Sequence, residues 1–230
     1  MYKSLAMAFA IFILTGCVSP IPLHEQTPSP EYKNEQPILI SVIDNRKKVK
    51  EGKPETFVGR AHATFGIPVD WSVEQILATD KGDKELTLTQ WLQKRIVKGL
   101  TEKGWQVTPV DFKTVPTETI ASYTLTEQES QQLLVLNLQE WFFSINLNWV
   151  SSFNFDTHVD TYLFDKEAGL TYQKTTQERD VIEEQGSESP QNNILRAYHD
   201  QLLQLLSDPA LKAQIQQKSQ TKIADTSTTL

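Results

Sequence analysis

The sequence has one cysteine, nine glycines and no excess of basic residues, and each shortage excludes a class of protein. A single cysteine excludes a domain stapled by disulfides and any metal site built on several thiolates. Lysine and arginine number 22 against 29 aspartate and glutamate residues, and this acidic balance argues against a nucleic-acid partner. Neither a Gly-x-Ser-x-Gly elbow nor a glycine-rich phosphate loop occurs, so we expect neither an enzyme nor a cofactor.

Long hydrophobic runs are also scarce, and the single clear one lies at the N-terminus. Residues 5–14 are ten uninterrupted apolar residues that follow the basic residue Lys3. A helix that crosses a bilayer needs about 20 apolar residues, so this run is too short to span a membrane. Its length and position are typical of the hydrophobic region of a signal peptide, which we assign to residues 1–16.

The end of this apolar run carries the most specific motif in the chain. Leu14-Thr15-Gly16-Cys17 resembles the lipobox of bacterial lipoproteins, in which small residues precede an obligatory cysteine. The resemblance implies cleavage between Gly16 and Cys17, diacylglycerol on the Cys17 thiol and acylation of the new amine. Several acyl chains give stable membrane anchoring. The alternative is an ordinary signal peptide that happens to end near a cysteine.

The residues after the cysteine indicate where such a protein would reside. Lipoproteins retained in the inner membrane of Gram-negative bacteria carry Asp after the cysteine, whereas this chain has Val18 and Ser19. The resemblance therefore implies an outer-membrane protein that faces the periplasm. Residues 18–37 contain five prolines, so we expect residues 17–37 to form an extended tether of up to about 60 Å.

The folded domain is expected over residues 38–213, and its first half has the pattern of a β-α-β unit. A β-branched run at 38–43 predicts a buried strand, and 56–65 a second strand. Ser72 is a candidate cap for a short helix that ends at 78. Apolar residues recur every four positions from Leu88 to Leu100, which predicts a helix that Gly104 ends before a strand at 105–108.

The second half is dominated by alternating residues, which predict a three-stranded antiparallel meander. The strands are expected at 133–149, 153–163 and 170–182, with a bulge near Gln139-Glu140 where the alternation changes parity. An apolar stripe then predicts a helix over 190–206, and residues 214–230 form a disordered polar tail. The polar segment 111–132 predicts one helical turn at 126–129. The fold is therefore expected to be a single α+β domain: a mixed, mostly antiparallel sheet with two main helices packed on one face.

Three segments support a family resemblance. They are the strand and turn at 42–46, the helix end and strand at 100–107, and the apolar strand at 133–138. Behind a lipobox, this order is similar to the YajG-type envelope lipoproteins and, more loosely, to the N-terminal domain of TolB-like proteins. The resemblance implies a binding or assembly role in the periplasm and no catalytic residues.

Two side-chain patterns are candidates for a site. Asp156, His158 and Asp160 project from one face of a predicted strand, where they form either a metal-binding row or an ordinary solvent-facing row, which we favour. Alternate residues from 141 to 149 form an aromatic stripe, with Trp141, Phe143 and Trp149 as its largest members. This stripe either binds a lipid or a protein partner, or packs beneath the helices as core, which we favour.

A basic cluster at 46–50 is expected to be a solvated loop. Together these features predict a non-enzymatic outer-membrane lipoprotein that interacts with an envelope protein of unknown identity. The alternatives are a lipoprotein that binds a lipid or small ligand and, less favoured, a metal-dependent hydrolase.

Overall fold

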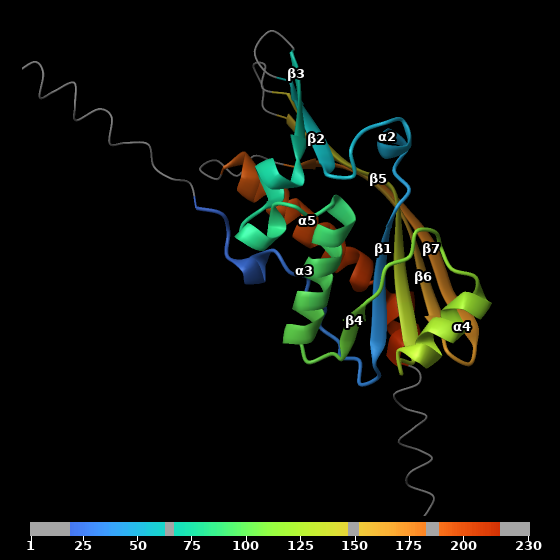
Figure 1. The fold of residues 1–230 in the computed structure, drawn as a ribbon. Helices are drawn as coiled ribbons and strands as arrows, with labels where there is room; N and C mark the ends of the chain where they lie inside the picture. The colour runs from blue at the N-terminus through green and yellow to red at the C-terminus, as the bar shows by residue number, and fades with distance from the viewer. Residues whose placement is uncertain (1–18, 63–66, 147–151, 183–188, 217–230) are drawn as a thin grey trace, which may run out of the picture.

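A seven-stranded mixed sheet with helices on both faces organises the chain in the computed structural model (Figure 1). The structure describes residues 19–62, 67–146, 152–182 and 189–216. The predicted α+β class with one domain is confirmed.

Strand β5 (Gln132–Asn146) is the centre of the sheet because three other strands pair with it. Its first half pairs in parallel with β1 (Ile38–Asp44), and its second half pairs in parallel with β2 (Phe57–His62). Strand β6 (Ser152–Asp165) pairs antiparallel with β5 along its whole length. The register of that pair shifts between Leu138 and Glu140, which confirms the predicted bulge.

The β-α-β unit is confirmed. Strand β4 (Val107–Pro109) pairs in parallel with β1, and helix α3 (Leu88–Glu102) makes the crossover between them. Thr87 begins the helix with a capping box that includes Gln90. Gly104 follows the helix with a φ of 90°, a left-handed conformation that glycine adopts without steric cost.

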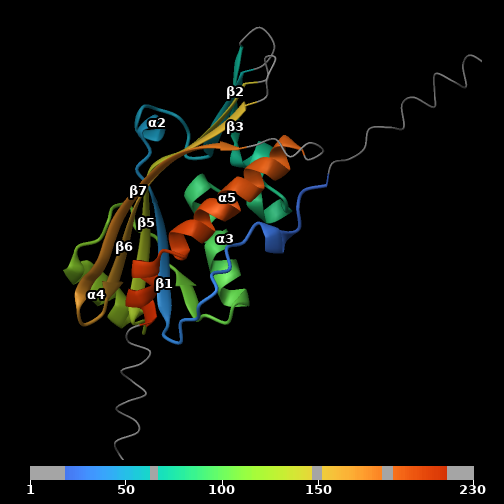
Figure 2. The ribbon, with the colours of Figure 1, turned by 180° about the vertical axis from the view of Figure 1, so that it is seen from behind.

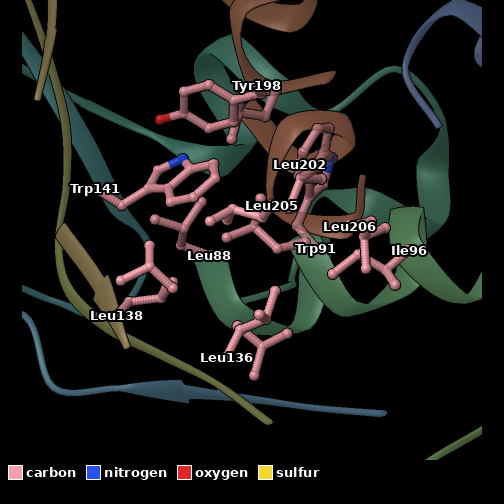
Figure 3. Close-up of a cluster of buried hydrophobic side chains, with 14 of the residues drawn as sticks. Leu88, Trp91, Ile96, Leu136, Leu138, Trp141, Tyr198, Leu202, Leu205 and Leu206 are labelled. Carbon is pink, nitrogen blue, oxygen red and sulfur yellow. The ribbon is translucent and has the colours of Figure 1, made fainter. Parts of the chain in front are cut away.

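Helices α3 and α5 (Pro190–Leu206) cover one face of the sheet, as predicted, and enclose the main core (Figure 2). Alternate residues of β5 point into this core, where Trp141 makes an edge-on contact with Tyr198 of α5 at 5.5 Å between ring centroids. Figure 3 shows these two rings above the leucines contributed by β5 and α5. The labelled members are Leu88, Trp91, Ile96, Leu136, Leu138, Trp141, Tyr198, Leu202, Leu205 and Leu206.

The opposite face carries a smaller core under a helix that the sequence did not predict. Helix α4 (Glu118–Glu127) begins at Thr117, whose side chain accepts a hydrogen bond from the Ile120 N–H. The prediction of one turn at 126–129 was therefore wrong. The apolar contribution of the helix is only Ala121 and Leu125, four residues apart, which pack on Leu39, Ile43, Leu133, Val135 and Phe164.

The remaining elements are short, apart from β7. Residues 47–50 form one helical turn, α2 (Lys47–Lys50), where a loop was expected. Strand β2 (Phe57–His62) accounts for most of the second predicted strand, and strand β3 (Pro68–Ser72) pairs with it; residues 63–65 of that prediction lie outside the described residues. Ser72 then caps the π-helix η4 (Val73–Leu77), as predicted, and η5 (Lys81–Asp83) follows. Strand β7 (Gly169–Ile182) completes the meander by pairing with β6.

The proline-rich segment before β1 is not the extended tether that its composition predicts. Residues 19–37 pack along α3 and α5, with a 3-10 turn, η2 (Leu23–Glu25), in between. Ile21 and Tyr32 are buried, and the Tyr32 hydroxyl donates a hydrogen bond of 2.8 Å to the Leu206 carbonyl. Proline restricts φ and removes a donor, but neither property prevents an extended segment from packing against helices. The folded body therefore begins at least 19 residues earlier than the predicted position 38.

The C-terminal boundary also shifts. Residues 209–216 are helical, and Leu211 and Ile215 are buried in the main core. The prediction of a disordered tail from residue 214 is wrong for residues 214–216, and residues 217–230 lie outside the described part of the chain.

Candidate interaction surface

Helix α4 covers only part of the outer face of the sheet and leaves the other part open. The open part holds a groove of about 1260 Å³ beside α2, bordered by β2, β5, β6 and β7. Figure 1 shows α4 and α2 at different ends of this face. The groove lies along the second half of β5, where β5 pairs with β2 rather than with β1. The register of β5 against these two strands therefore sets the position of the groove.

A buried arginine fixes the wall that α2 forms. The Arg46 guanidinium is 3% exposed, bonds to the Asp44 carboxylate at 2.7 Å and donates to the backbone carbonyls of Glu55 and Phe57. The expectation of a solvated basic loop is therefore wrong for Arg46. Its hydrogen bonds connect the end of β1 to the start of β2, and α2 begins at the next residue.

Lys48 of α2 covers an aromatic ring on the floor of the groove. Its ammonium lies 3.9 Å from the centroid of the Phe142 ring and 2.9 Å from the Glu140 carboxylate. Phe142 in turn stacks on Phe57 with 5.8 Å between ring centroids. A cation over an aromatic face contributes about 0.5–1 kcal/mol at a partly exposed site, so this contact helps to hold α2 against the sheet.

The groove is basic although the whole chain is acidic. Five of its lining residues are lysine or arginine and three are aspartate or glutamate, together with His62 and His158. Lys50 is exposed and makes no ion pair within the described residues. The surface therefore offers positive charge that the groove's own carboxylates do not neutralise.

On the β2–β3 ribbon, an ion pair offsets the charge of Arg60, one of these five cations. Asp70 accepts hydrogen bonds from Arg60 and Lys53. The Arg60 hydrogen bond is the largest cause that lowers the pKa of the Asp70 carboxyl, and it also raises the pKa of Arg60. Both groups are therefore charged across the physiological pH range.

The row of Asp156, His158 and Asp160 lies on the outer face of β6, as predicted, but both carboxylates are already used. Asp156 accepts two hydrogen bonds from Arg179 at 2.5 and 3.1 Å. Asp160 accepts hydrogen bonds from Gln139 and Thr175 at 3.1 and 2.6 Å. Across the ranges that the structure describes, no group of three or more candidate ligands is arranged to hold a metal ion.

The aromatic stripe belongs to the core rather than to a surface. Trp141 and Phe143 are each 1% exposed and lie beneath α5, where both contact Tyr198. These two side chains therefore do not line an open pocket, and Trp149 lies outside the described residues.

Sequence reasoning missed the groove because its walls come from segments far apart in the chain. The outward position of Phe142 between two core residues was a detectable signal, since a large aromatic on the solvent side of an alternating strand needs a partner. The partners themselves, on α2 and β2, depend on a parallel pairing that local patterns do not reveal.

The lipobox residues, including Gly16 and Cys17, lie outside the described part of the chain, as does the expected signal peptide. Among the helices that the structure does describe, none has the length and hydropathy needed to span a bilayer.

No protein-family model and no curated protein sequence matches the chain. Several solved structures resemble it at low identity. The protein XCC0632 from Xanthomonas campestris, of the DUF330 family, is 11% identical, with a TM-score of 0.46 over 85% of this chain and 94% of that one. The PelC dodecamer from Paraburkholderia phytofirmans is 11% identical, with a TM-score of 0.37 over 79% and 92%. The lipoprotein GNA1162 from Neisseria meningitidis is 10% identical, with a TM-score of 0.30 over 74% and 99%.

Proposed function

We propose that this protein is an outer-membrane lipoprotein, anchored through acyl chains on Cys17, that faces the periplasm and binds an envelope protein without catalysing a reaction. The observation that carries the proposal is the ten-residue apolar run that ends in Leu14-Thr15-Gly16-Cys17. The open basic groove is its binding surface.

The docked N-terminal segment determines how an anchored domain would sit. Asn192 near the start of α5 bonds to the Ile21 N–H at 3.0 Å and to the Ser19 carbonyl at 3.3 Å. Ser19 is the first described residue, and the single residue between it and Cys17 allows a chain span of at most about 7 Å. A lipid on Cys17 would therefore hold the domain close to the membrane surface.

The groove is available to a partner in this arrangement. Figures 1 and 2 place the described N-terminus and α2 at opposite sides of the domain. The excess of lysine and arginine in the groove complements an acidic protein surface. A lipid ligand is less well supported, because the helices already cover the aromatic residues that would contact it.

Metabolic labelling with palmitate tests the anchor. We expect the native chain to incorporate label and to lose it in Cys17→Ser, which should accumulate as an uncleaved precursor. Label that persists in Cys17→Ser would contradict the proposed anchor.

Site-specific photo-crosslinking in cells tests the groove separately. A photoreactive phenylalanine analogue at His158, in the groove, should give a discrete adduct, whereas the same group at Glu102, on the exposed side of α3, should not. Adding Lys50→Glu should weaken the groove adduct, and the matched surface change Lys113→Glu should leave it unchanged. Equal adducts from both positions, or none from the groove, would contradict this assignment.

A further inference from the structure

Strand β7 forms a long edge of the sheet that no other strand covers in the described part of the chain. It has 14 residues and pairs only with β6. The other two edges are much shorter, because β3 has five residues and β4 has three, including Pro109. A long edge exposes a row of backbone N–H and C=O groups that another strand can pair with.

The sequence of β7 suits pairing with a polar strand. It contains no proline. Residues 173–182 pair with β6 without a break, and the first four of these residues are polar. Side chains on both of its faces are polar along most of its length. Only the register shift near Leu170 departs from regular geometry.

A twofold axis limits the registers in which β7 pairs with a second copy of itself. Side chains alternate between the two faces of a strand. For the outer faces of the two sheets to lie on the same side, each residue must therefore face one of the same odd or even number in the other copy. With the axis at Thr176, Lys174 of each copy lies opposite Glu178 of the other, and Gln173 lies opposite Arg179. The Lys174–Glu178 ion pair forms twice, and no like charges are opposed.

The same register also brings exposed apolar side chains together. Val181 is 64% exposed at one end of β7 and lies on the α4 side of the sheet. Ile120 and Tyr123 of α4 are 50% and 67% exposed, and α4 lies beside the other end of β7, where Glu118 accepts a hydrogen bond from the Leu170 N–H. Within one chain, Val181 lies about 36 Å along β7 from Leu170, the residue beside α4. An axis at Thr176 places Val181 opposite residue 171, beside α4 of the second copy.

We infer that a second copy of this chain pairs antiparallel with β7 about a twofold axis at Thr176, which joins the two sheets into one. Charge complementarity along the edge and the meeting of separated apolar residues both favour a second copy over an unrelated strand. The inference does not depend on the lipid anchor. It is also independent of the groove proposal, although Gln177, Glu178 and Arg179 of β7 also line the groove.

Charge exchange tests this pairing in the full-length chain, solubilised in detergent and measured by sedimentation. Lys174→Glu opposes two pairs of glutamates and Glu178→Lys opposes two pairs of lysines, so each should weaken the dimer about tenfold or more. An equimolar mixture of the two variants should recover the dimer, because every pair then joins opposite charges. Lys113→Glu is the matched control and should dimerise like the native chain.

The mixture separates pairing from damage within one copy. Lys174→Glu loses the hydrogen bond to Asp208 and Glu178→Lys loses the one from Gln204, and each variant loses its contact whether or not the two are mixed. A native chain that remains monomeric, single variants that dimerise normally, or a mixture that stays monomeric would each overturn the inference.

Engineered thiols give a second readout in cells. Thr176→Cys places two thiols directly opposite each other, with Cβ atoms about 5 Å apart, and should form a disulfide-linked dimer under mild oxidation. Gln173→Cys leaves its two thiols about 20 Å apart and should stay monomeric. The reverse pattern would exclude an axis at Thr176.

Discussion

Replacing Gly99 with alanine tests whether residues 19–37 belong to the folded body. Gly99 lies in α3, and a Cβ atom there would lie 2.1 Å from the Pro28 carbonyl oxygen and 3.0 Å from its carbon. Ordinary contacts of this kind begin at 3.4 Å, so the segment or the helix must move by more than 1 Å. The neighbouring atoms are backbone, which cannot rotate out of the way as a side chain can.

Two opposing effects decide the sign of the change in stability. Alanine in a helix interior is about 1 kcal/mol more favourable than glycine. Against this, displacement of the segment exposes Ile21 and Tyr32, each of which contributes roughly 1.5–3 kcal/mol when fully buried. After allowance for the chain entropy that the released segment regains, we expect a net loss of about 1–3 kcal/mol.

Thermal melting and limited proteolysis measure the two consequences. Gly99→Ala should lower Tm by about 2–4 °C for each kcal/mol lost, and trypsin should cleave faster after Lys33. Gly82→Ala is the matched control, because its Cβ meets only side-chain atoms at 3.2 Å or more. If Gly99→Ala is instead more stable by about 1 kcal/mol and equally resistant to trypsin, the segment is not packed on α3.

Other predictions concern buried and exposed partners. Asp83→Asn should cost about 3–5 kcal/mol, because it leaves the buried Arg95 without its carboxylate at 2.6 Å, whereas Asp80→Asn on the surface should change stability by about 0.5 kcal/mol or less. Burial is the largest single influence on the pKa of Asp83 and raises it. The hydrogen bonds and charges of Arg95 and Lys94, with the Thr79 N–H, together outweigh burial and lower the pKa, so this stabilisation is present above about pH 4 and is lost as pH falls further. Acid titration of unfolding should therefore be shallower in Asp83→Asn; equal slopes would refute the assignment. Trp141→Ala should cost about 3–5 kcal/mol and Phe142→Ala clearly less, and equal losses in denaturant unfolding would mean that the two faces of β5 are assigned wrongly.

Local patterns predicted most of the elements, because their signals lie within one segment. The parity change after Leu138 indicated the bulge, and Thr87 with Gly104 indicated both ends of α3. The helix α4 escaped prediction because only Ala121 and Leu125 mark its buried side among threonines and serines, which are weak helix formers.

The features that sequence reasoning missed depend on contacts between distant segments. Nothing in the prolines of residues 19–37 indicates that Gly99 leaves space for Pro28. Likewise, the groove exists because β2 pairs with the second half of β5, and Arg46 is buried because it bonds to carbonyls nine and eleven residues away. The charge of such residues is visible in the sequence, but their burial is set by the tertiary fold.

Intact mass spectrometry of the protein extracted from outer membranes tests the proposed role most directly. A polypeptide that begins at Cys17 and carries diacylglycerol and an amide-linked acyl chain is the predicted result. A chain that still begins at Met1, or one with an unmodified thiol at residue 17, would contradict the membrane-anchored function.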